Sequence, residues 1–312
     1  MAPVNRPRDR AQLILVGGLV VAVGLVALAI VLNSGIYTHN LASRADPTAS
    51  EAVGHTAAVR DSVGGLVEYE VGHNPDDTSE QVRNVTDGTS NVSAQVARAS
   101  ARRGLLTNAT VNATVNGTTV NQTGDRNFSD TASPPNPSWT VATDAHGVRD
   151  FRMNATQASL NETSTPLTGS VFNVTFDSGG SEFVVSVYND SHTTSLLVTD
   201  TTAGRSFGPC TDTGARTVVD ITEATVAGEH CAALGRIEDL PRPYDVEFDQ
   251  ADNVTGSYSL VANTTSVDVG SPGDAGPSEM ETLYAVWVEI AFQSQRVDYR
   301  TNVTVAPGEF DG

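Results

Sequence analysis

The spacing of hydrophobic residues along the chain changes twice, and the first pattern is a continuous apolar run. Residues 13–32 read LILVGGLVVAVGLVALAIVL. As a helix they would be about 30 Å long, the thickness of a bilayer's hydrocarbon core. Three arginines and one aspartate precede the run, whereas no basic residue follows it before Arg44. Positive charge marks the cytoplasmic side. The pattern therefore predicts a transmembrane helix over 13–33, a cytoplasmic tip over 1–12 and an extracellular remainder.

A cleaved secretory signal is the alternative interpretation of this run. Such signals typically have an apolar region of about 7 to 15 residues followed by an A-x-A-like cleavage site, and residues 13–32 match neither feature well.

The second pattern is apolar spacing close to the helical period, which covers residues 34–106 in part. Asp46-Pro47 is a plausible helix start, and a second helical stretch is expected from about Thr78 to Leu106. Glycine in the interior weakens both predictions. We expect a helical stalk made by apolar positions at Ala52, Val59, Val63, Leu66, Val67, Val82, Val85, Val92 and Val96.

Beyond about Leu106, apolar and polar residues alternate, which is typical of strands. Asn116-Gly117 predicts a hairpin turn, and the Pro-Pro pair in 133–138 a linker. The fold class predicted is α+β, with a transmembrane helix continuing into a helical stalk and then a mainly antiparallel β-sandwich-like domain over 107–312. Its further strands are expected at Trp139–Thr143, Val148–Leu160, Val171–Asp177, Glu182–Asn189, Thr193–Thr199, Arg216–Thr222, Tyr244–Asp249, Ser257–Ala262, Thr282–Phe292 and Val297–Val305.

The charge of the chain excludes one class of partner and favours one habitat. Its 312 residues carry a net charge of −19, and all 18 basic residues are arginine. An acidic surface repels phosphate, so we expect no nucleic acid partner. At molar salt the Debye length is about 3 Å and self-repulsion is screened. Acidity without lysine therefore favours a salt-rich habitat.

N-glycosylation acceptor sequences, N-x-[ST], are strongly enriched. Fourteen of the 19 asparagines begin one, against about four expected by chance. All lie beyond the apolar run, on the side that the arginines independently predict to be outside. The candidates are Asn84, Asn91, Asn108, Asn112, Asn116, Asn121, Asn127, Asn154, Asn161, Asn173, Asn189, Asn253, Asn263 and Asn302.

The two cysteines, Cys210 and Cys231, are both on the predicted outer side. A single pair in an oxidising compartment predicts a disulfide. His230 adjoins Cys231, but no C-x-x-C or H-x-x-x-H pattern supplies further metal ligands. We expect no metal and no other cofactor.

Two patterns could carry chemistry. Residues 204–208 match G-x-S-x-G around Ser206, but a nucleophile elbow needs a strand before it and a helix after it, and Pro209 follows at once. We interpret this string as a turn in a glycine-rich loop. Asp245, Glu247 and Asp249 alternate along one predicted strand and would share a face, which could attract a cation; a solvated acidic face is the simpler interpretation.

The junction Arg10-Ala11-Gln12-Leu13, followed directly by the apolar run, resembles that of haloarchaeal secreted or membrane-anchored proteins of unknown function with a pilin-like N-terminal helix. In archaeal prepilins a similar junction is cut by a membrane peptidase, and the apolar helix then packs into a filament core. The resemblance implies processing between Ala11 and Gln12.

The function predicted from these patterns is that of a single-pass membrane-anchored, extracellular, glycosylated cell-envelope protein. Its role would be structural, adhesive or in assembly, without enzymatic activity, and its partners the lipid bilayer through residues 13–33 and other envelope or pilus-like proteins. Two alternatives stay open: a minor pilin-like subunit, and an anchored extracellular hydrolase that uses Ser206.

Overall fold

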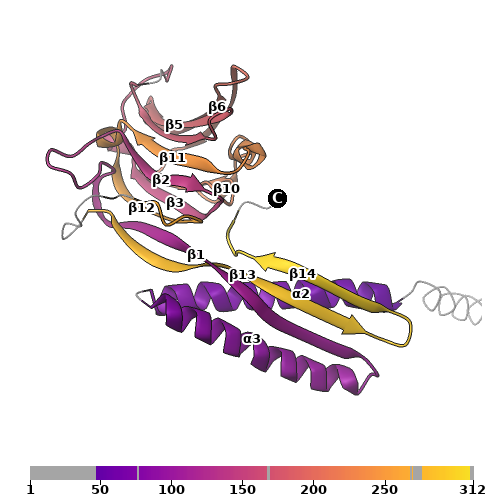
Figure 1. Ribbon diagram of the computed structural model, residues 1–312. Coiled ribbons are helices and arrows are strands. Elements are labelled where there is room, and N and C mark those ends of the chain that lie inside the picture. The colour runs from indigo at the N-terminus through magenta and orange to yellow at the C-terminus, as the bar shows by residue number, and fades with distance from the viewer. Residues whose placement is uncertain (1–46, 76, 167–168, 268, 270–275, 310–312) are drawn as a thin grey trace, which may run out of the picture.

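The computed structural model describes residues 47–75, 77–166, 169–267, 269 and 276–309. Two helices come first, α2 (Pro47–His73) and α3 (Thr78–Ala101), and antiparallel strands make up most of the rest of the described chain (Figure 1). The strands are β1 (Leu106–Asn127), β2 (Trp139–Ala145), β3 (Val148–Thr156), β4 (Phe172–Asp177), β5 (Glu182–Asp190), β6 (Thr193–Asp200), β7 (Arg205–Asp212), β8 (Arg216–Asp220), β9 (Thr225–Val226), β10 (Glu229–His230), β11 (Tyr244–Asp249), β12 (Thr255–Ala262), β13 (Ser278–Gln293) and β14 (Asp298–Val305). Short 3-10 helices are η1 (Gln157–Ser159), η2 (Leu234–Asp239) and η3 (Ala251–Asn253).

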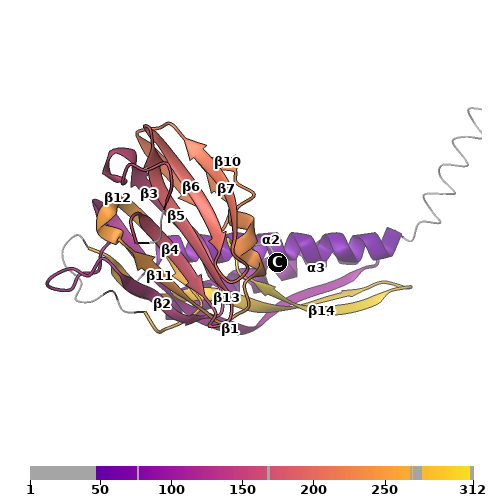
Figure 2. The ribbon, with the colours of Figure 1, turned by 90° about the horizontal axis from the view of Figure 1, so that it is seen from above.

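The strands form two sheets that pack face to face. One sheet has eight strands in the order β10-β9-β8-β3-β12-β1-β13-β14, and the other has six in the order β2-β11-β4-β5-β6-β7. Figure 2 shows the two layers from above. Alternating residues of both sheets point into the space between them, as in other β-sandwiches. The β-sandwich predicted from the alternating pattern is therefore present.

Aromatic rings fill the centre of the sandwich. Phe248 on β11 is fully buried, and its ring lies 5.1 Å from that of Tyr258 and 5.4 Å from that of Phe172. Phe128 stacks against it at 6.0 Å, and Trp139 meets it edge-on at 5.7 Å. Edge-to-face pairs of this kind contribute beyond the area that they bury. The sandwich thus has a core of its own.

The second part of the molecule is an arm, which we define as residues 106–117 of β1, residues 282–293 of β13, strand β14 and both helices. Here β1 and β13 run on beyond the sandwich and pair with each other, and β14 pairs with β13 on its other side (Figure 1). Because the same two strands belong to both parts, one continuous sheet joins arm and sandwich.

The helices cover one face of the arm strands. A compact aliphatic cluster forms there between Val63 and Val67 of α2, Val85 of α3, and Val288 and Ile290 of β13. The two helices approach closely because α3 has a glycine at the crossing: a Cβ on Gly88 would lie 3.1 Å from the side chain of Leu66. The same glycine that weakened the prediction of α3 thus serves its packing.

Helix termini follow the local sequence. Helix α2 begins at Pro47, as Asp46-Pro47 predicted, since proline suits the first turn, where its missing N–H is not needed. Helix α3 begins after Asp77, whose carboxylate accepts a hydrogen bond from the backbone N–H of Glu80 at 2.8 Å.

The predicted fold class is wrong in its helical part. Among the described residues, no helix is both long and apolar enough to cross a membrane. The two described helices lie against the sheet instead of forming a separate stalk ahead of it, because their apolar faces are buried on β1, β13 and β14. The chain is mostly antiparallel sheet with two helices over about residues 47–101. The predicted transmembrane segment, 13–33, lies outside the described residues.

The hairpin predicted at Asn116-Gly117 is also wrong. Strand β1 runs through this dipeptide and pairs with β13 from Leu106 to Asn121. The glycine is needed for another reason: β12 joins the other side of β1 here, and a Cβ on Gly117 would collide with the carbonyl oxygen of Ala262. Close approach of a backbone explains this glycine as well as a turn would.

Candidate functional site

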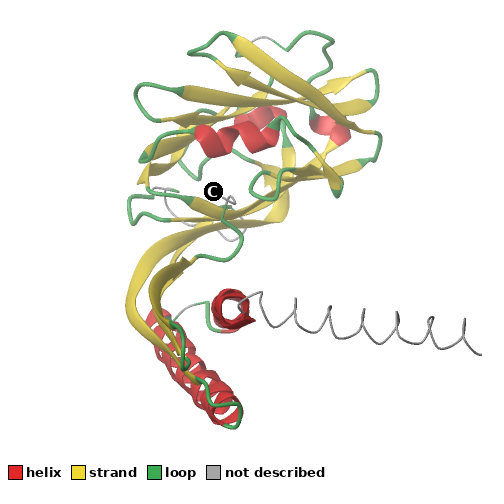
Figure 3. Ribbon diagram, turned by 90° about the vertical axis from the view of Figure 1, so that its right-hand side faces the viewer, coloured by secondary structure: helices red, strands yellow, loops and turns green. Residues whose placement is uncertain are grey.

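The largest hollow in the described part of the molecule is a groove where the arm meets the sandwich. Its volume is about 1140 Å³, and three segments line it: helix α2, the loops of residues 222–242, and the end of β14 with residues 306–309 that follow it. Charged side chains of both signs line its walls, including Arg60, Glu68, Glu238 and Arg242. Figure 3 shows the arm and the sandwich from the side, with α2 seen end-on.

A buried arginine forms the joint beside this groove. Arg149 on β3 is 1% exposed, and its guanidinium donates to Asp150 Oδ2 at 2.8 Å, to the carbonyl of Leu283 at 3.0 Å and to that of Pro307 at 3.2 Å. It also lies 5.7 Å from the centre of the Tyr284 ring. One side chain therefore connects three segments: β3, β13 and the segment after β14.

The segment after β14 is held on β3 from both sides. The N–H of Asp150 donates to the carbonyl of Gly308 at 3.0 Å, and Glu309 forms an ion pair with Arg242 at 2.5 Å. Gly308 has φ of +72°, and a Cβ there would collide with the Asp150 carboxylate. Glycine at this position is therefore required both by its backbone conformation and by space.

Burial dominates the electrostatics of the joint. It lowers the pKa of Arg149, which the neighbouring Asp150 partly offsets, and it raises the pKa of Asp150, against the opposite pull of Arg149. Burial likewise raises the pKa values of Tyr244 and Tyr284, and Glu309 raises that of Tyr284 further. The charged groups stabilise one another across the joint, as a buried ion pair requires. This arrangement can fix the angle between arm and sandwich.

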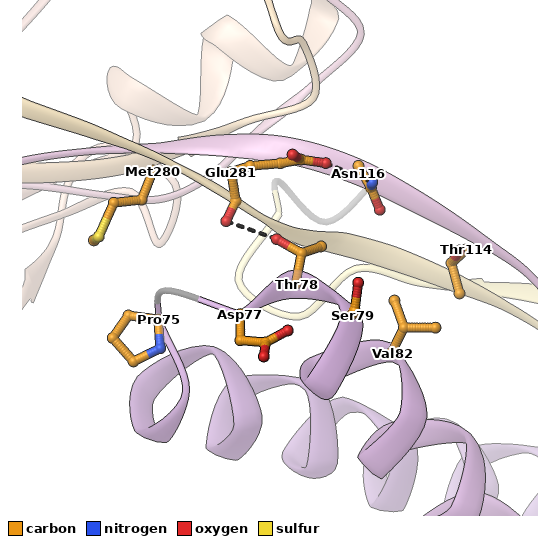
Figure 4. A pocket seen from close by; sticks show the side chains of 9 residues that line it. All are labelled: Pro75, Asp77, Thr78, Ser79, Val82, Thr114, Asn116, Met280 and Glu281. Atoms are coloured by element: carbon orange, nitrogen blue, oxygen red, sulfur yellow. Dashed lines mark hydrogen bonds between the residues drawn. The ribbon is translucent and has the colours of Figure 1, made fainter.

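A smaller and shallower hollow lies at the start of α3 (Figure 4). Its polar groups are already engaged in the fold: Thr78 Oγ1 donates to the carbonyl of Glu281 at 2.9 Å, and Asp77 caps the helix. The side-chain amide of Asn116 donates to Glu281 Oε1 at 2.8 Å. These contacts attach α3 to β13 and β1, which is a structural task.

Ser206 does not lie in the context of a nucleophile elbow, nor in the loop that we predicted. The string 204–208 enters strand β7, which was not predicted and which continues to Asp212. The hydroxyl of Ser206 is hydrogen-bonded to that of Thr199 on the neighbouring strand at 3.1 Å. An elbow requires a strand-to-helix turn. The surroundings of Ser206 are those of a residue on a sheet.

Asp245, Glu247 and Asp249 lie on one face of β11, as the alternation predicted. Asp177 pairs with Asp245 in the adjacent strand, so four carboxylates share this surface. Burial raises the pKa of Glu247, and the neighbouring acidic groups raise it further. Within the described ranges, no group of three or more histidine, cysteine, aspartate or glutamate side chains is arranged to hold a metal ion.

The two cysteines come together at one end of the sandwich. Cys210 on β7 and Cys231, just after β10, form a disulfide with their Cα atoms 5.9 Å apart. Because β7 is an edge strand of the six-stranded sheet and β10 an edge strand of the other, the bond ties the two layers together.

The acceptor asparagines differ widely in exposure. Two are buried and could not carry a sugar in this fold, Asn173 at 1% and Asn189 at 8% exposed. Five are half-buried: Asn84, Asn121, Asn154, Asn253 and Asn263. Seven are exposed: Asn91, Asn108, Asn112, Asn116, Asn127, Asn161 and Asn302.

The predicted processing site, Ala11 and Gln12, lies outside the described residues. Sequence reasoning also missed Arg149, Glu309 and Trp287. Arg149-Asp150 within a predicted strand was the only signal for the joint, because a β-bulge at this point breaks the alternation that would have placed the arginine inside. An exposed tryptophan within an otherwise apolar strand gave no signal of its own.

Comparison with known families gives one match. Residues 7–134 match a family described as a family of unknown function (DUF7261), a stretch that includes α2, α3 and β1 and is less than half of the chain. No curated protein and no solved structure matches the chain. The match says nothing about a haloarchaeal origin or a pilin-like N-terminus.

Proposed function

We propose that this chain is a non-enzymatic, glycosylated structural protein of the cell envelope, which works outside the cytoplasm by holding its sandwich at a fixed angle on the arm. The observation that carries the proposal is the continuity of β1 and β13 through both parts, together with the Arg149 joint. A sheet shared by two cores resists bending between them. A stiff spacer of this kind suits display or assembly.

Two further features support a role outside the cytoplasm. Disulfides form and persist in oxidising compartments, and Cys210–Cys231 joins the two layers of the sandwich. Seven of the acceptor asparagines lie on the surface, where a sugar can be accommodated. Contact with a bilayer through residues 13–33 and processing between Ala11 and Gln12 stay predictions from sequence.

The location can be tested by adding a broad-specificity protease to intact cells. We expect the chain to be degraded while a cytoplasmic marker protein stays whole. Should the chain survive in intact cells yet be cleaved after lysis, it lies inside, and the proposal is wrong.

The hydrolase alternative is tested with a serine-reactive probe. The contacts of Ser206 favour equal and negligible labelling of the wild type and of Ser206→Ala, with Ser195→Ala, on the neighbouring strand β6, as the control. Labelling that is lost only in Ser206→Ala would make the protein an enzyme.

A further inference from the structure

The face of the arm strands that points away from the helices is open, and acceptor asparagines gather on it. Val286, Val288 and Ile290 of β13 point toward the helices, so Trp287, Glu289 and Ala291 point the other way. The register places Asn108 of β1 opposite Ala291, and Asn302 of β14 opposite Glu289.

A third acceptor joins them through a bulge. Strand β1 has an irregularity between Val111 and Ala113, and the side-chain amide of Asn112 donates to Glu289 Oε2 at 3.1 Å. Asn112 therefore lies on the same open face. All three acceptor side chains are exposed.

Trp287 lies in the middle of this face. It is 45% exposed, whereas the other tryptophan, Trp139, is 8% exposed and lies in the sandwich. Its cross-strand neighbours are small, Ala113 on one side and Thr304 on the other, which leaves both sides of the ring accessible. Directly opposite residues have Cβ atoms about 5 Å apart, and diagonal neighbours about 7 to 8 Å. Asn302, diagonal to Trp287, is within reach through a single attached sugar.

The existing hydrogen bonds of these asparagines are compatible with modification. Asn108 donates its side-chain amide to Thr110 Oγ1 at 3.0 Å, as Asn112 does to Glu289. An N-linked sugar replaces one of the two amide hydrogens, so the other can still donate. The sugar then extends from the sheet without breaking the contact.

An open sheet face beside a free edge also needs protection. Strand β14 is the last strand of its sheet, whereas on the opposite side of the arm the edge of β1 is covered by α3, where Ser93 Oγ accepts from the N–H of Ala109 at 2.8 Å. Uncovered edges with apolar side chains invite pairing with other chains. A sugar on Asn302 would cover both the edge of β14 and the side of Trp287.

We propose that N-linked glycans on Asn108, Asn112 and Asn302 cover the open face of the arm, and that a sugar ring packs against Trp287. The ligand of Trp287 is thus the chain's own saccharide, whose apolar C–H face suits an aromatic surface. The inference rests on the proposed function only in requiring that the chain is glycosylated. It adds which acceptors matter and what the exposed tryptophan is for.

Site-specific mass spectrometry of glycopeptides from the full chain, purified from its native cells, tests the first half. We expect sugar on Asn108, Asn112 and Asn302, and none on the buried Asn173 and Asn189. Sugar found elsewhere but absent from all three arm positions overturns the inference and leaves the proposed function standing. A chain without any sugar overturns both, whereas the protease experiment tests location separately.

Quenching of tryptophan fluorescence by acrylamide tests the second half, since Trp139 provides a shielded background. Removing the acceptor in Asn302→Gln should raise the quenching constant of the exposed tryptophan by about twofold, because the sugar no longer covers the ring. The control, Asn161→Gln, removes an exposed acceptor far from the arm, just beyond η1, and should leave quenching unchanged.

Two results contradict the packing of sugar on Trp287. One is equal quenching in the wild type and in Asn302→Gln when Asn302 is known to be modified. The other is quenching of the glycosylated wild type that falls as protein concentration rises, which would assign the open face to contact with a second copy of the chain.

Discussion

The sandwich and the arm are built from the same sheet but bury it differently. In the sandwich both inner faces are covered by another sheet, and the core contains interlocking rings around Phe248. In the arm one face is covered by two helices through aliphatic side chains such as Val67 and Ile290, and the other face meets solvent around Trp287. A surface protein can thus keep one part for stability and another for its surroundings.

The difference indicates where each kind of substitution should act. Changes in the aromatic cluster should affect stability most, changes at the joint should affect how the parts hold together, and changes on the outer surface should have small effects that depend on pH and salt.

The largest effect is expected from truncating the centre of the sandwich. Phe248→Ala should lower the free energy of unfolding by about 5 kcal/mol, because five rings surround the cavity and cannot collapse into it. Phe292→Ala in the arm is the matched control, since Phe292 is 2% exposed but lies in a small cluster, and should cost about 3 kcal/mol. Denaturant unfolding measures both. Equal costs would mean that the two cores are packed alike.

Next comes the joint. Arg149→Met should cost about 3 kcal/mol, because it leaves Asp150 and two carbonyl oxygens without their buried donor. The control is Arg216→Met, which removes an ion pair with Asp125 in which both partners are about half exposed, and should cost less than about 1 kcal/mol. If thermal unfolding finds the two variants equally stable, Arg149 does not hold the arm to the sandwich.

The smallest effect concerns the acidic face of β11. The pKa of Glu247 is raised in the fold, so the folded state binds more protons than the unfolded state and stability falls as pH rises above the ordinary range of glutamate. Glu247→Gln removes this penalty and should stabilise by about 0.5 kcal/mol at neutral pH, since like charges share the face.

The sign of this effect can be checked by measuring thermal unfolding across pH. The gain from Glu247→Gln should vanish near pH ~4, where glutamate is largely protonated, and shrink in high salt. The exposed Glu229 provides a control, as Glu229→Gln should change little. A gain that is largest in acid would reverse the assignment.

Much of the strand layout could be predicted from the sequence because alternation reports directly on burial. The prediction Tyr244–Asp249 has the same bounds as β11, and Glu182–Asn189 differs from β5 by one residue. Strand β7 was missed because Gly204, Gly208 and Pro209 conceal its alternation. The hairpin at Asn116-Gly117 failed because the sequence does not distinguish a glycine needed for a turn from one needed for a close contact.

The site was less predictable because it depends on contacts between distant segments. Nothing near Arg149 in the sequence indicates that residues 307–309 fold back onto β3. The acceptor asparagines were recognisable one by one, but the register of three strands was needed to find Asn112 and Asn302 around Trp287. Burial of Asn173 likewise depends on the second sheet.

The central claim, that arm and sandwich are one stiff body, is tested most directly by native-state hydrogen exchange along β13 in the full chain. This strand passes from the sandwich into the arm, so its amides report on both parts. We predict the same free energy of opening for Tyr284, near the joint, and for Val288 and Ile290, in the arm, because they are released only when the whole molecule unfolds. Arm amides that exchange through a separate opening of much lower free energy would contradict the account.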